Sequence, residues 1–524
     1  MRMILVLVSL LLLAVFFAES LKYELIYFQQ NSYRPRRYWN SLKKEITGRR
    51  YRMNLLLIIC FVMFINHYWI NILLTIFAFA IVCKRFRKKY KKPVVFTARA
   101  IRLCMVSSLI ALAVLMSLVC CGMIDIAPLV LLGGAGFASL LLLTANILLY
   151  PIERYINYYY YRNAERILRS MPNLKIIGIT GSYGKTSTKH YLYRILSEKY
   201  NVLMTPGNFN TTLGVIRTIR EQLKSYHEIF IVEMGAKQLG DIKEICDLVN
   251  PSIGIITAVG EQHLETFKSV QNIQKTKFEL MDALPASGLS VLNFDYEYIA
   301  NRDHASSIVK DIVSYSMGDN SEADYFVEDI RVEKGKTLFS IYSEKVLVDT
   351  IETGLLGKYN ISNLLACYIV AARLGIDKQC IKNAVVDILP VEHRLSIKVT
   401  ADEITIIDDA YNSNPRGAKM AVDVLAQYKG NKKIIITPGM VELGEKQFVD
   451  NRKFGEYIAK FVTYVIIVGQ YNRKALEEGL KNGGFDMDKC HFVPTLADAT
   501  FILKGIITSG DVVLYENDLP DTFK

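Results

Sequence analysis

The sequence has little of what a zinc-binding or disulfide-linked protein needs. Its 524 residues include nine cysteines, and none of these forms a C-x-x-C pair or a Cys/His cluster with the spacing of zinc ligands. This absence argues against a structural zinc site. Five cysteines lie in or beside apolar runs and four are scattered, which is typical of reduced thiols in a protein that faces the cytosol.

Acidic residues are scarce in the first third of the chain. Residues 1–163 contain 21 Lys and Arg but only 5 Asp and Glu, whereas the remaining residues contain 42 and 46. The net charge of +12 therefore comes from the N-terminal third. This distribution argues against nucleic-acid binding by the rest of the chain, and because the basic clusters flank long apolar runs, it indicates a membrane region that contacts lipid.

Four apolar runs follow one another in this region, at residues 3–18, 53–83, 101–121 and 127–149. The first lacks an A-x-A cleavage site, which favours an uncleaved anchor over a signal peptide. The second fits either a hairpin of two short helices or one tilted helix, so about four or five transmembrane helices are expected in residues 1–163. The basic clusters then predict a multi-pass protein of the cell membrane whose later domains are cytoplasmic.

The stretch LKIIGITGSYGKTSTKHYLYRIL (174–196) predicts a phosphate-binding loop: a buried strand ends at the glycine turn GSYG, and KTS opens a helix. Lys185 reaches the terminal phosphates of a nucleotide, and the Thr186 hydroxyl is placed to bind Mg²⁺. Ile179 stands where the strict pattern has glycine, so an ordinary strand-to-helix turn is the alternative. The residues expected to bind the nucleotide are Gly181, Ser182, Gly184, Lys185, Thr186 and Ser187.

Polar residues also follow two later strands. The apolar run 229–232 ends in Glu233, where a carboxylate for Mg²⁺ is expected, and the stretch 254–267 contains His263. Alternating strands and helices predict a parallel sheet, whose carboxyl ends collect ligands at one edge. The alternatives are a solvated glutamate at a strand end and a histidine of a turn. These residues by themselves support an enzyme that uses Mg²⁺ and ATP.

Nine sequence blocks resemble the Mur ligase family, the ATP-dependent amide-bond-forming enzymes of cell-wall synthesis, and are most similar to its D-alanyl-D-alanine-adding (MurF) type. The blocks are GITGSYGKTSTK (178–189), TPGNFNTTLG (205–214), VEMGAKQLGDI (232–242), ITAVGEQHLETF (256–267), KTKFEL (275–280), GKYNISNLLA (357–366), EHRLS (392–396), DDAYNSNP (408–415) and GMVELGEKQ (439–447). They occur in the order of the family and cover about residues 170–520.

The resemblance implies a role for each matching residue. It implies that Lys185, Lys277 and His263 are catalytic, with Lys277 as the lysine that the family uses as a carbamate. It further implies that Thr186, Glu233, His263 and Lys277 hold Mg²⁺, His263 at a second ion. Asn360 and Asn363 match the asparagines on the adenine side, and Arg394 and Asp409 match residues that reach the nucleotide from the C-terminal domain.

The same resemblance implies an α/β fold. A phosphate-loop central domain is expected at 164–391, where residues 316–356 alternate at period two and predict edge strands. A doubly wound, Rossmann-like domain is expected at 392–524, where the runs EITII, KKIIIT, YVIIV and DVVLY predict four strands separated by helices. Three features depart from the family. Residues 1–163 stand in place of the UDP-binding domain, Tyr359 stands where relatives often have histidine, and YENDLPD (515–521) replaces a Lys-Gly-Ser-Arg segment, so the acceptor or the closing geometry is expected to differ.

The expected function is a membrane-anchored ligase that joins an amino acid or dipeptide such as D-Ala-D-Ala to a glycan-peptide precursor, carried on UDP or on a lipid. ATP would activate the precursor as an acyl phosphate. Three alternatives stay open: a synthase of poly-amino-acid capsules, the phosphate-loop ATPase of a membrane transporter, and a catalytically silent binding partner. The blocks DDAYNSNP and EHRLS favour the cell-wall enzyme over the capsule synthase.

Overall fold

The structure is a computed structural model. It describes residues 2–31, 33–35, 38–39, 42, 49–63, 68–86, 94–123, 126–207, 209–262, 264–304, 308–309, 311–318, 323–333, 336–411, 413–428 and 431–519. The chain divides into two compact units, one of helices that ends at Tyr158 and one that runs from Tyr159 to Leu519.

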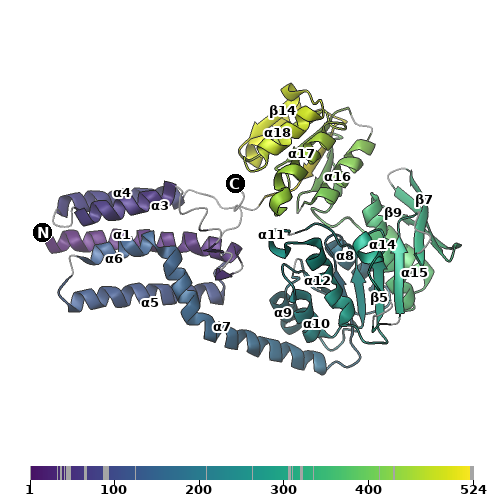
Figure 1. The fold of residues 1–524 in the computed structure, drawn as a ribbon, viewed down its shortest axis with the longest axis horizontal. Helices are drawn as coiled ribbons and strands as arrows, with labels where there is room; N and C mark the ends of the chain where they lie inside the picture. The colour runs from purple at the N-terminus through teal and green to yellow at the C-terminus, as the bar shows by residue number, and fades with distance from the viewer. Residues whose placement is uncertain are drawn as a thin grey trace. The chain divides into compact units, whose positions relative to one another are not determined.

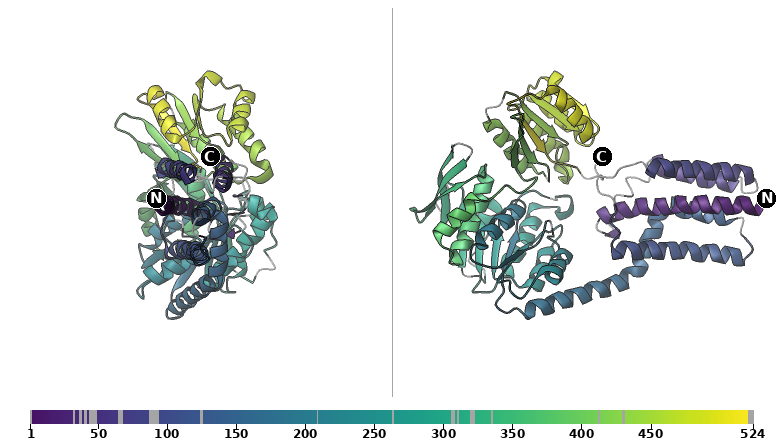
Figure 2. Two further views of the ribbon diagram at one scale, coloured as in Figure 1. Left: turned by 90° about the vertical axis from the view of Figure 1, so that its left-hand side faces the viewer. Right: turned by 180° about the vertical axis from the view of Figure 1, so that it is seen from behind.

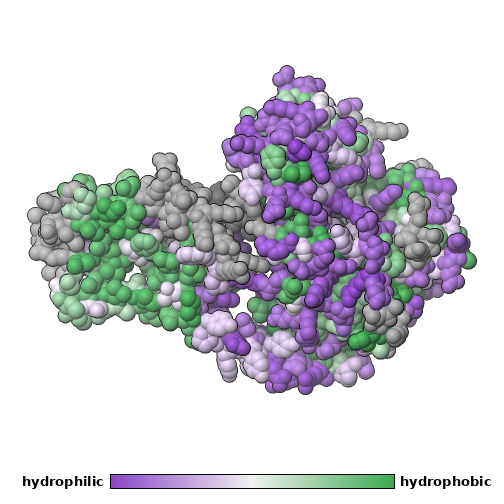
Figure 3. All heavy atoms as spheres, viewed as in Figure 1, coloured by the Kyte–Doolittle hydropathy of each residue, from purple (hydrophilic) through white to green (hydrophobic). Residues whose placement is uncertain are grey.

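The N-terminal unit is helical (Figure 1). Its helices are α1 (Arg2–Gln30), α3 (Arg49–Met63), α4 (Tyr68–Phe86), α5 (Ala98–Cys120), α6 (Ala127–Gly136) and α7 (Ala138–Arg169), of which the last continues into the second unit. Helix α1 packs against α4 and α6, and buries Leu13, Phe16 and Leu25 between them. Figure 2 shows these helices running alongside one another, and Figure 3 shows that hydrophobic side chains cover much of their described surface.

The predicted multi-pass membrane localisation is wrong. Among the described residues one helix, α5, is long and apolar enough to cross a membrane, and the pair α6 and α7, bent by 83°, would be a second if counted as one span. The run 53–83 forms two helices, α3 and α4, as the first of its two alternatives expected, and α1 carries the buried polar side chains Glu19 and Glu24. Apolar side chains such as Leu56 and Leu109 are exposed on this unit, but α3 has 15 residues and the apolar part of α4 is Ile72–Ile81, so these stretches are shorter than a membrane span. Neither four or five transmembrane helices nor a cytoplasmic assignment of the later domains follows from this structure.

The second unit begins with a nine-stranded sheet in the order β2-β3-β1-β4-β5-β6-β7-β8-β9. The strands are β1 (Lys175–Thr180), β2 (Val202–Met204), β3 (Ile229–Glu233), β4 (Ile253–Ile256), β5 (Leu289–Asn293), β6 (Asp311–Ser316), β7 (Tyr325–Glu333), β8 (Lys336–Ser343) and β9 (Val346–Thr353). Strands β1 to β7 pair in parallel, and β7, β8 and β9 pair antiparallel, so the edge strands expected at 316–356 are confirmed.

Helices cover both faces of this sheet because its strands are apolar on both sides. Ile177 and Ile179 face the cluster formed with α8 (Lys185–Leu196), α14 (Lys358–Arg373) and α15 (Lys378–Val386). Ile176 faces the other cluster, formed with α9 (Thr212–Gln222), α10 (Asp241–Val249) and α12 (Val270–Asp282), as Figure 1 shows. Two single-turn helices, α11 (Leu264–Phe267) and α13 (Glu297–Ala300), follow β4 and β5.

The C-terminal part has a six-stranded sheet in the order β10-β11-β15-β12-β13-β14. Its elements are β10 (Ser396–Val399), β11 (Thr405–Asp409), α16 (Pro415–Gln427), β12 (Lys433–Thr437), η2 (Gly444–Lys446), α17 (Gln447–Ile458), β13 (Tyr464–Val468), α18 (Arg473–Asn482), η3 (Met487–Lys489), β14 (Cys490–Val493), α19 (Leu496–Ile506) and β15 (Val512–Glu516). The four predicted strands are confirmed as β11, β12, β13 and β15, and β10 and β14 add an edge strand on each side. The α/β fold is therefore confirmed.

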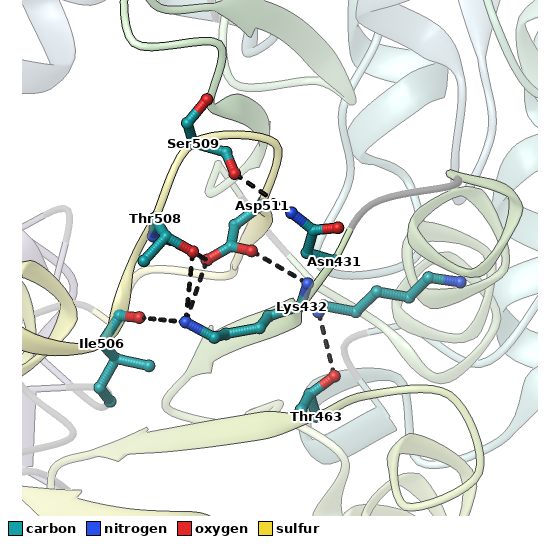
Figure 4. Close-up of polar contacts among 8 residues, drawn as sticks. Asn431, Lys432, Thr463, Ile506, Thr508, Ser509 and Asp511 are labelled. Carbon is teal, nitrogen blue, oxygen red and sulfur yellow. Dashed lines mark hydrogen bonds and ion pairs between the residues drawn. The ribbon is translucent and has the colours of Figure 1, made fainter.

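A polar cluster holds the amino ends of the C-terminal strands together (Figure 4). The carboxylate of Asp511 is buried before β15 and accepts hydrogen bonds from the backbone N–H groups of Lys432 (3.0 Å) and Thr508 (2.8 Å). The ammonium of Lys432 donates to the Ile506 carbonyl at 2.8 Å. These contacts lie at the opposite edge from the strand ends that carry the residues discussed below, so they support the fold and leave the other edge free for ligands.

A buried carboxyl group lies at that other edge. Asp409, at the end of β11, is paired in register with Glu516, at the end of β15. The Glu516 side chain accepts hydrogen bonds from the hydroxyls of Ser413 and Thr437. Burial raises the pKa of Glu516 from 4.5 to about 7, which the two hydroxyls oppose, and the nearby charge of Asp409 raises it further.

This pKa predicts a pH-dependent stability. The folded protein keeps a proton on Glu516 that the unfolded chain releases, so the free energy of unfolding should fall as pH rises from about 4.5 to about 7. The Glu516→Gln variant keeps the shape and removes the titration, and the free energy of its unfolding by urea should fall by about 2 kcal/mol less between pH 5 and pH 7.5 than that of the wild type. Equal losses in both proteins would show that Glu516 is ionised throughout.

Candidate active site

The turn between β1 and α8 needs glycine at two positions. Gly181 and Gly184 have φ angles of +154° and +83°. A Cβ atom on Gly184 would lie 2.5 Å from Oδ1 of Asn363, and one on Gly181 would lie 2.1 Å from Oγ1 of Thr257. The turn is thus packed closely between β4 and α14, and α8 begins directly after Gly184, so its first N–H groups face the end of the sheet. This is the geometry of a phosphate-binding loop.

The predicted loop residues divide into two groups. Lys185 donates to the Gly181 carbonyl at 2.6 Å, so its ammonium curls over its own loop, and burial lowers its pKa to about 8. Thr186 points to the strand end next to the loop, where its hydroxyl donates to Glu233 at 3.1 Å. Ser182 instead donates to the Gly260 carbonyl, and Ser187 is buried within α8, so their side chains support the loop.

Glu233 is the centre of the site. Its Oε1 accepts hydrogen bonds from Thr186 and from the Asn210 amide (3.2 Å), and its Oε2 lies 3.0 Å from the ammonium of Lys189. Its backbone N–H donates to the Thr205 hydroxyl at 3.1 Å. Burial alone would raise the pKa of this carboxyl, but Lys189 and Lys185 outweigh burial and hold the pKa below its ordinary value. Glu233 is therefore a buried, ionised carboxylate beside the phosphate loop.

Sequence reasoning did not identify Lys189 and Asn210 as site residues. Lys189 lies four residues after Lys185 on the same helix, and this spacing, which places two side chains on one helix face, was the available signal. Asn210 belongs to the block TPGNFNTTLG, to which no role was given. Its carbonyl also accepts from the backbone N–H of Gly235 at 2.7 Å, so it fixes both the side chain and the backbone around Glu233.

Lys277 lies in α12, and its side chain is only 3% exposed. Burial lowers the pKa of this amine well below its ordinary value, and the charge of Lys185 lowers it further. Glu279, two residues later, accepts from the backbone N–H groups of Gly240 (2.7 Å) and Lys243 (2.9 Å) and so joins α12 to the start of α10. His263, the other predicted metal ligand, lies outside the described residues.

The two predicted adenine-side asparagines differ in their surroundings. Asn360 accepts from the Tyr191 hydroxyl at 2.9 Å and donates to the Leu356 carbonyl at 2.8 Å, so its side chain is used within the fold. Asn363 lies against Gly184 of the phosphate loop. The ring of Tyr359, which stands where relatives often have histidine, is half-buried and has the Arg416 guanidinium 5.7 Å from its centroid.

Arg394 and Asp409 come from the start of the C-terminal sheet. The Arg394 guanidinium lies 4.0 Å from the centre of the Tyr411 ring, and burial lowers its pKa while Asp409 opposes that shift. Asp409 accepts from the backbone N–H of Leu395 at 3.1 Å, and burial raises its pKa to about 6. The charge of Arg394 also lowers the pKa of Lys185, so the structure brings Arg394 to the electrostatic field of the phosphate loop.

The residues fit a Mg²⁺ ion that arrives with a nucleotide. In the described parts of the chain, no group of three His, Cys, Asp or Glu side chains is placed to hold a metal ion. Glu233 Oε2 has the Lys189 ion pair but accepts no directed hydrogen bond, and the Thr186 hydroxyl is beside the same carboxylate. Mg²⁺ commonly takes one or two protein oxygens together with phosphates and water. Thr186 and Glu233 supply such a pair.

Comparison with known proteins gives the family. The model of the Mur ligase middle domain matches residues 179–371, and that of the Mur ligase glutamate ligase domain matches residues 393–515. The chain is 30% identical over 365 residues to the UDP-N-acetylmuramoyl-tripeptide–D-alanyl-D-alanine ligase of Mycobacterium tuberculosis, covering 65% of this chain and 70% of that protein. Identity to the Bacillus subtilis protein of the same name is 27% over 344 residues, covering 65% and 72%.

Solved structures agree with these matches. A MurF structure from Acinetobacter baumannii has a TM-score of 0.61 at 25% identity and covers 68% of this chain and 77% of its own. The MurF ligase of Thermotoga maritima, solved in complex with ADP, has the same fold, with a TM-score of 0.60 at 24% identity over 69% of this chain and 80% of its own. A phosphate loop and a buried glutamate at one sheet edge, within two matched domains, lead to one conclusion: the chain belongs to the Mur ligase family and is an ATP-dependent ligase.

Proposed function

We propose that the protein joins D-Ala-D-Ala to the peptide of a UDP-linked glycan-peptide precursor of the cell wall, in the manner named for its curated relatives. The observation that carries this proposal is the buried Glu233, held by Thr186 at the mouth of the phosphate loop, with the amine of Lys277 buried nearby in the field of Lys185. The residues proposed to contact the nucleotide are the loop glycines, Lys185, Thr186, Asn363, Arg394 and Asp409.

The proposed reaction proceeds through an acyl phosphate. A precursor carboxylate oxygen bonds to the terminal phosphorus of ATP, the bond from that phosphorus to the bridging oxygen breaks, and ADP leaves. The amine of the acceptor then bonds to the acyl carbon and loses a proton, and phosphate leaves with the former carboxylate oxygen. The Lys185 ammonium, once released from the Gly181 carbonyl, neutralises charge that develops on the transferred phosphoryl group.

Bound Mg²⁺ would supply Lewis-acid stabilisation of the phosphates, and Thr186 and Glu233 are the residues proposed to hold it. Lys277 is proposed to act as a carbamate, because burial lowers the pKa of its amine and so favours the neutral form, which is the form that reacts with CO₂. His263 remains the proposed ligand of a second Mg²⁺. The proposed domain bounds are 164–391 and 392–524, and residues 1–163 lie outside both family matches.

The first test supplies ATP, Mg²⁺ and UDP-linked or lipid-linked precursor with a panel of amines, and follows phosphate release and product mass. D-Ala-D-Ala with the UDP-linked precursor should give a product, and Lys185→Ala should lower turnover by at least about a hundredfold. Lys243→Ala, at a side chain 64% exposed on α10, is the matched control and should retain activity. Appreciable ligation by Lys185→Ala, or no product with any amine, would refute the proposal.

The second test addresses Lys277. Activity should fall in buffer depleted of CO₂ and return on addition of bicarbonate, and ¹³C-bicarbonate should give a carbamate resonance in the folded protein. Lys277→Arg should lack the resonance and stay inactive, whereas Lys275→Arg, an exposed lysine of the same helix, should resemble the wild type. Activity that does not depend on CO₂, together with no carbamate signal, would contradict the assignment.

A further inference from the structure

Lys189 forms a fully buried ion pair with the proposed metal ligand. The side chains of Lys189 and Glu233 are 0% and 2% exposed, and Nζ of Lys189 lies 3.0 Å from Oε2 of Glu233. The same ammonium donates to the Gly207 carbonyl at 2.7 Å. A buried pair of this kind costs desolvation energy on both partners and is often no more stabilising than apolar side chains. Its presence beside the phosphate loop therefore points to a role other than stability.

The pair leaves Glu233 without free negative charge in the nucleotide-free protein. Oε1 accepts two hydrogen bonds, from Thr186 and Asn210, while Oε2 faces the Lys189 ammonium. Two cations besides Lys189 act on this carboxylate or its neighbours. Lys185, like Lys189, lowers the pKa of Glu233, and the charge of Arg394 lowers the pKa of Lys185. Arg394 also interacts with the carboxyl group of Asp409, so the cations that act directly on Glu233 are Lys189 and Lys185, two against one carboxylate.

A divalent cation that approached this carboxylate alone would meet an excess of positive charge. Like charges a few ångströms apart in a partly buried site repel by far more than one tenfold step in affinity. A nucleoside triphosphate reverses the balance, since its phosphates offset Lys185 and Arg394 and also provide oxygen ligands that Mg²⁺ prefers. Among the described residues, the oxygens proposed to hold the ion beside the phosphate loop are the Thr186 hydroxyl and the paired carboxylate of Glu233.

We propose that Lys189 is a positioning residue that makes divalent-metal binding depend on the nucleotide. Its ammonium holds Glu233 in place through Oε2 and keeps a metal ion from binding the empty site, so that Mg²⁺ enters only together with the nucleotide phosphates. This inference rests on the proposed function of the site. It adds to that function an order of binding, enforced by one buried ammonium, and it assigns Lys189 no contact with the substrate.

The test measures binding of Mn²⁺, a paramagnetic substitute for Mg²⁺, by electron paramagnetic resonance on the full chain, with and without a non-hydrolysable ATP analogue. Lys189→Gln removes the charge but keeps a donor for Glu233 and Gly207, and it should bind Mn²⁺ without nucleotide at least about tenfold more tightly than the wild type. Lys189→Arg keeps the charge and should match the wild type. The double variant Lys189→Gln, Glu233→Gln removes the carboxylate and should lose the added binding.

Several results would overturn the inference. Equal Mn²⁺ affinities of wild type and folded Lys189→Gln without nucleotide would remove the role of Lys189, while the proposed ligase function would stand if both proteins bind Mn²⁺ with the analogue. A wild type that binds Mn²⁺ equally well with and without nucleotide would refute the inference without any variant. Failure of the wild type to bind Mn²⁺ even with the analogue would refute the proposed nucleotide site itself, and the inference with it.

Discussion

The structure depends on how one buried carboxylate is held at the carboxyl edge of the central sheet. Glu233 ends β3, between the loop that follows β1 and the segment that follows β2, because the strand order β2-β3-β1 places these ends side by side. Thr186 reaches it from the loop, Asn210 from the segment, and Lys189 from α8. No contact of this set joins neighbours in the sequence, so the site exists only when the parallel sheet has formed.

This arrangement gathers cationic side chains around Glu233. Lys185, Lys189 and Arg394 are partly or fully buried cations that act on one another or on Glu233, and burial with the field of Lys185 lowers the pKa of Lys277. Such an excess of positive charge is costly in the empty protein and is compensated when a polyphosphate binds. The charges of Lys189 and Lys185 keep Glu233 ionised, as a carboxylate is in water, whereas burial and the charge of Lys185 lower the pKa of Lys277 and favour its neutral amine.

Much of the fold was predictable because its strands are short apolar runs that end at glycine or at polar residues. Ile176 to Ile179 and 229–232 predicted buried parallel strands, and the alternation at 316–356 predicted the edge sheet, as observed. Strand β14, with the sequence CHFV, was not predicted, because its polar residues break the apolar pattern. The membrane prediction failed because apolar runs are divided into helices shorter than a membrane span, such as α3 with 15 residues, and hydropathy along the chain does not show where a helix ends.

From the residues alone, the phosphate loop was the part of the site that could be predicted in detail, because its residues lie in one short motif. The loop from Gly181 to Thr186 has its chemistry within six consecutive residues, whereas the contacts of Lys189 with Glu233 and Gly207 depend on sheet order, which spacing along the chain does not show. The roles of Lys277, Arg394 and Asp409 came from family resemblance, and the structure contributes their burial and fields. Within the departure at 515–521, Glu516 accepts hydrogen bonds from two hydroxyls, and these contacts also depend on the sheet rather than on spacing along the chain.

The central claim is that residues at this edge of the sheet transfer the last phosphoryl group of ATP to a carboxylate. An amine then displaces phosphate from the acyl phosphate that results. The most direct measurement uses precursor labelled with ¹⁸O in the reacting carboxylate and analyses the phosphate released by mass spectrometry. An acyl phosphate predicts one ¹⁸O atom in each phosphate, because the carboxylate oxygen leaves with phosphorus. Phosphate released during product formation without any ¹⁸O would contradict the account.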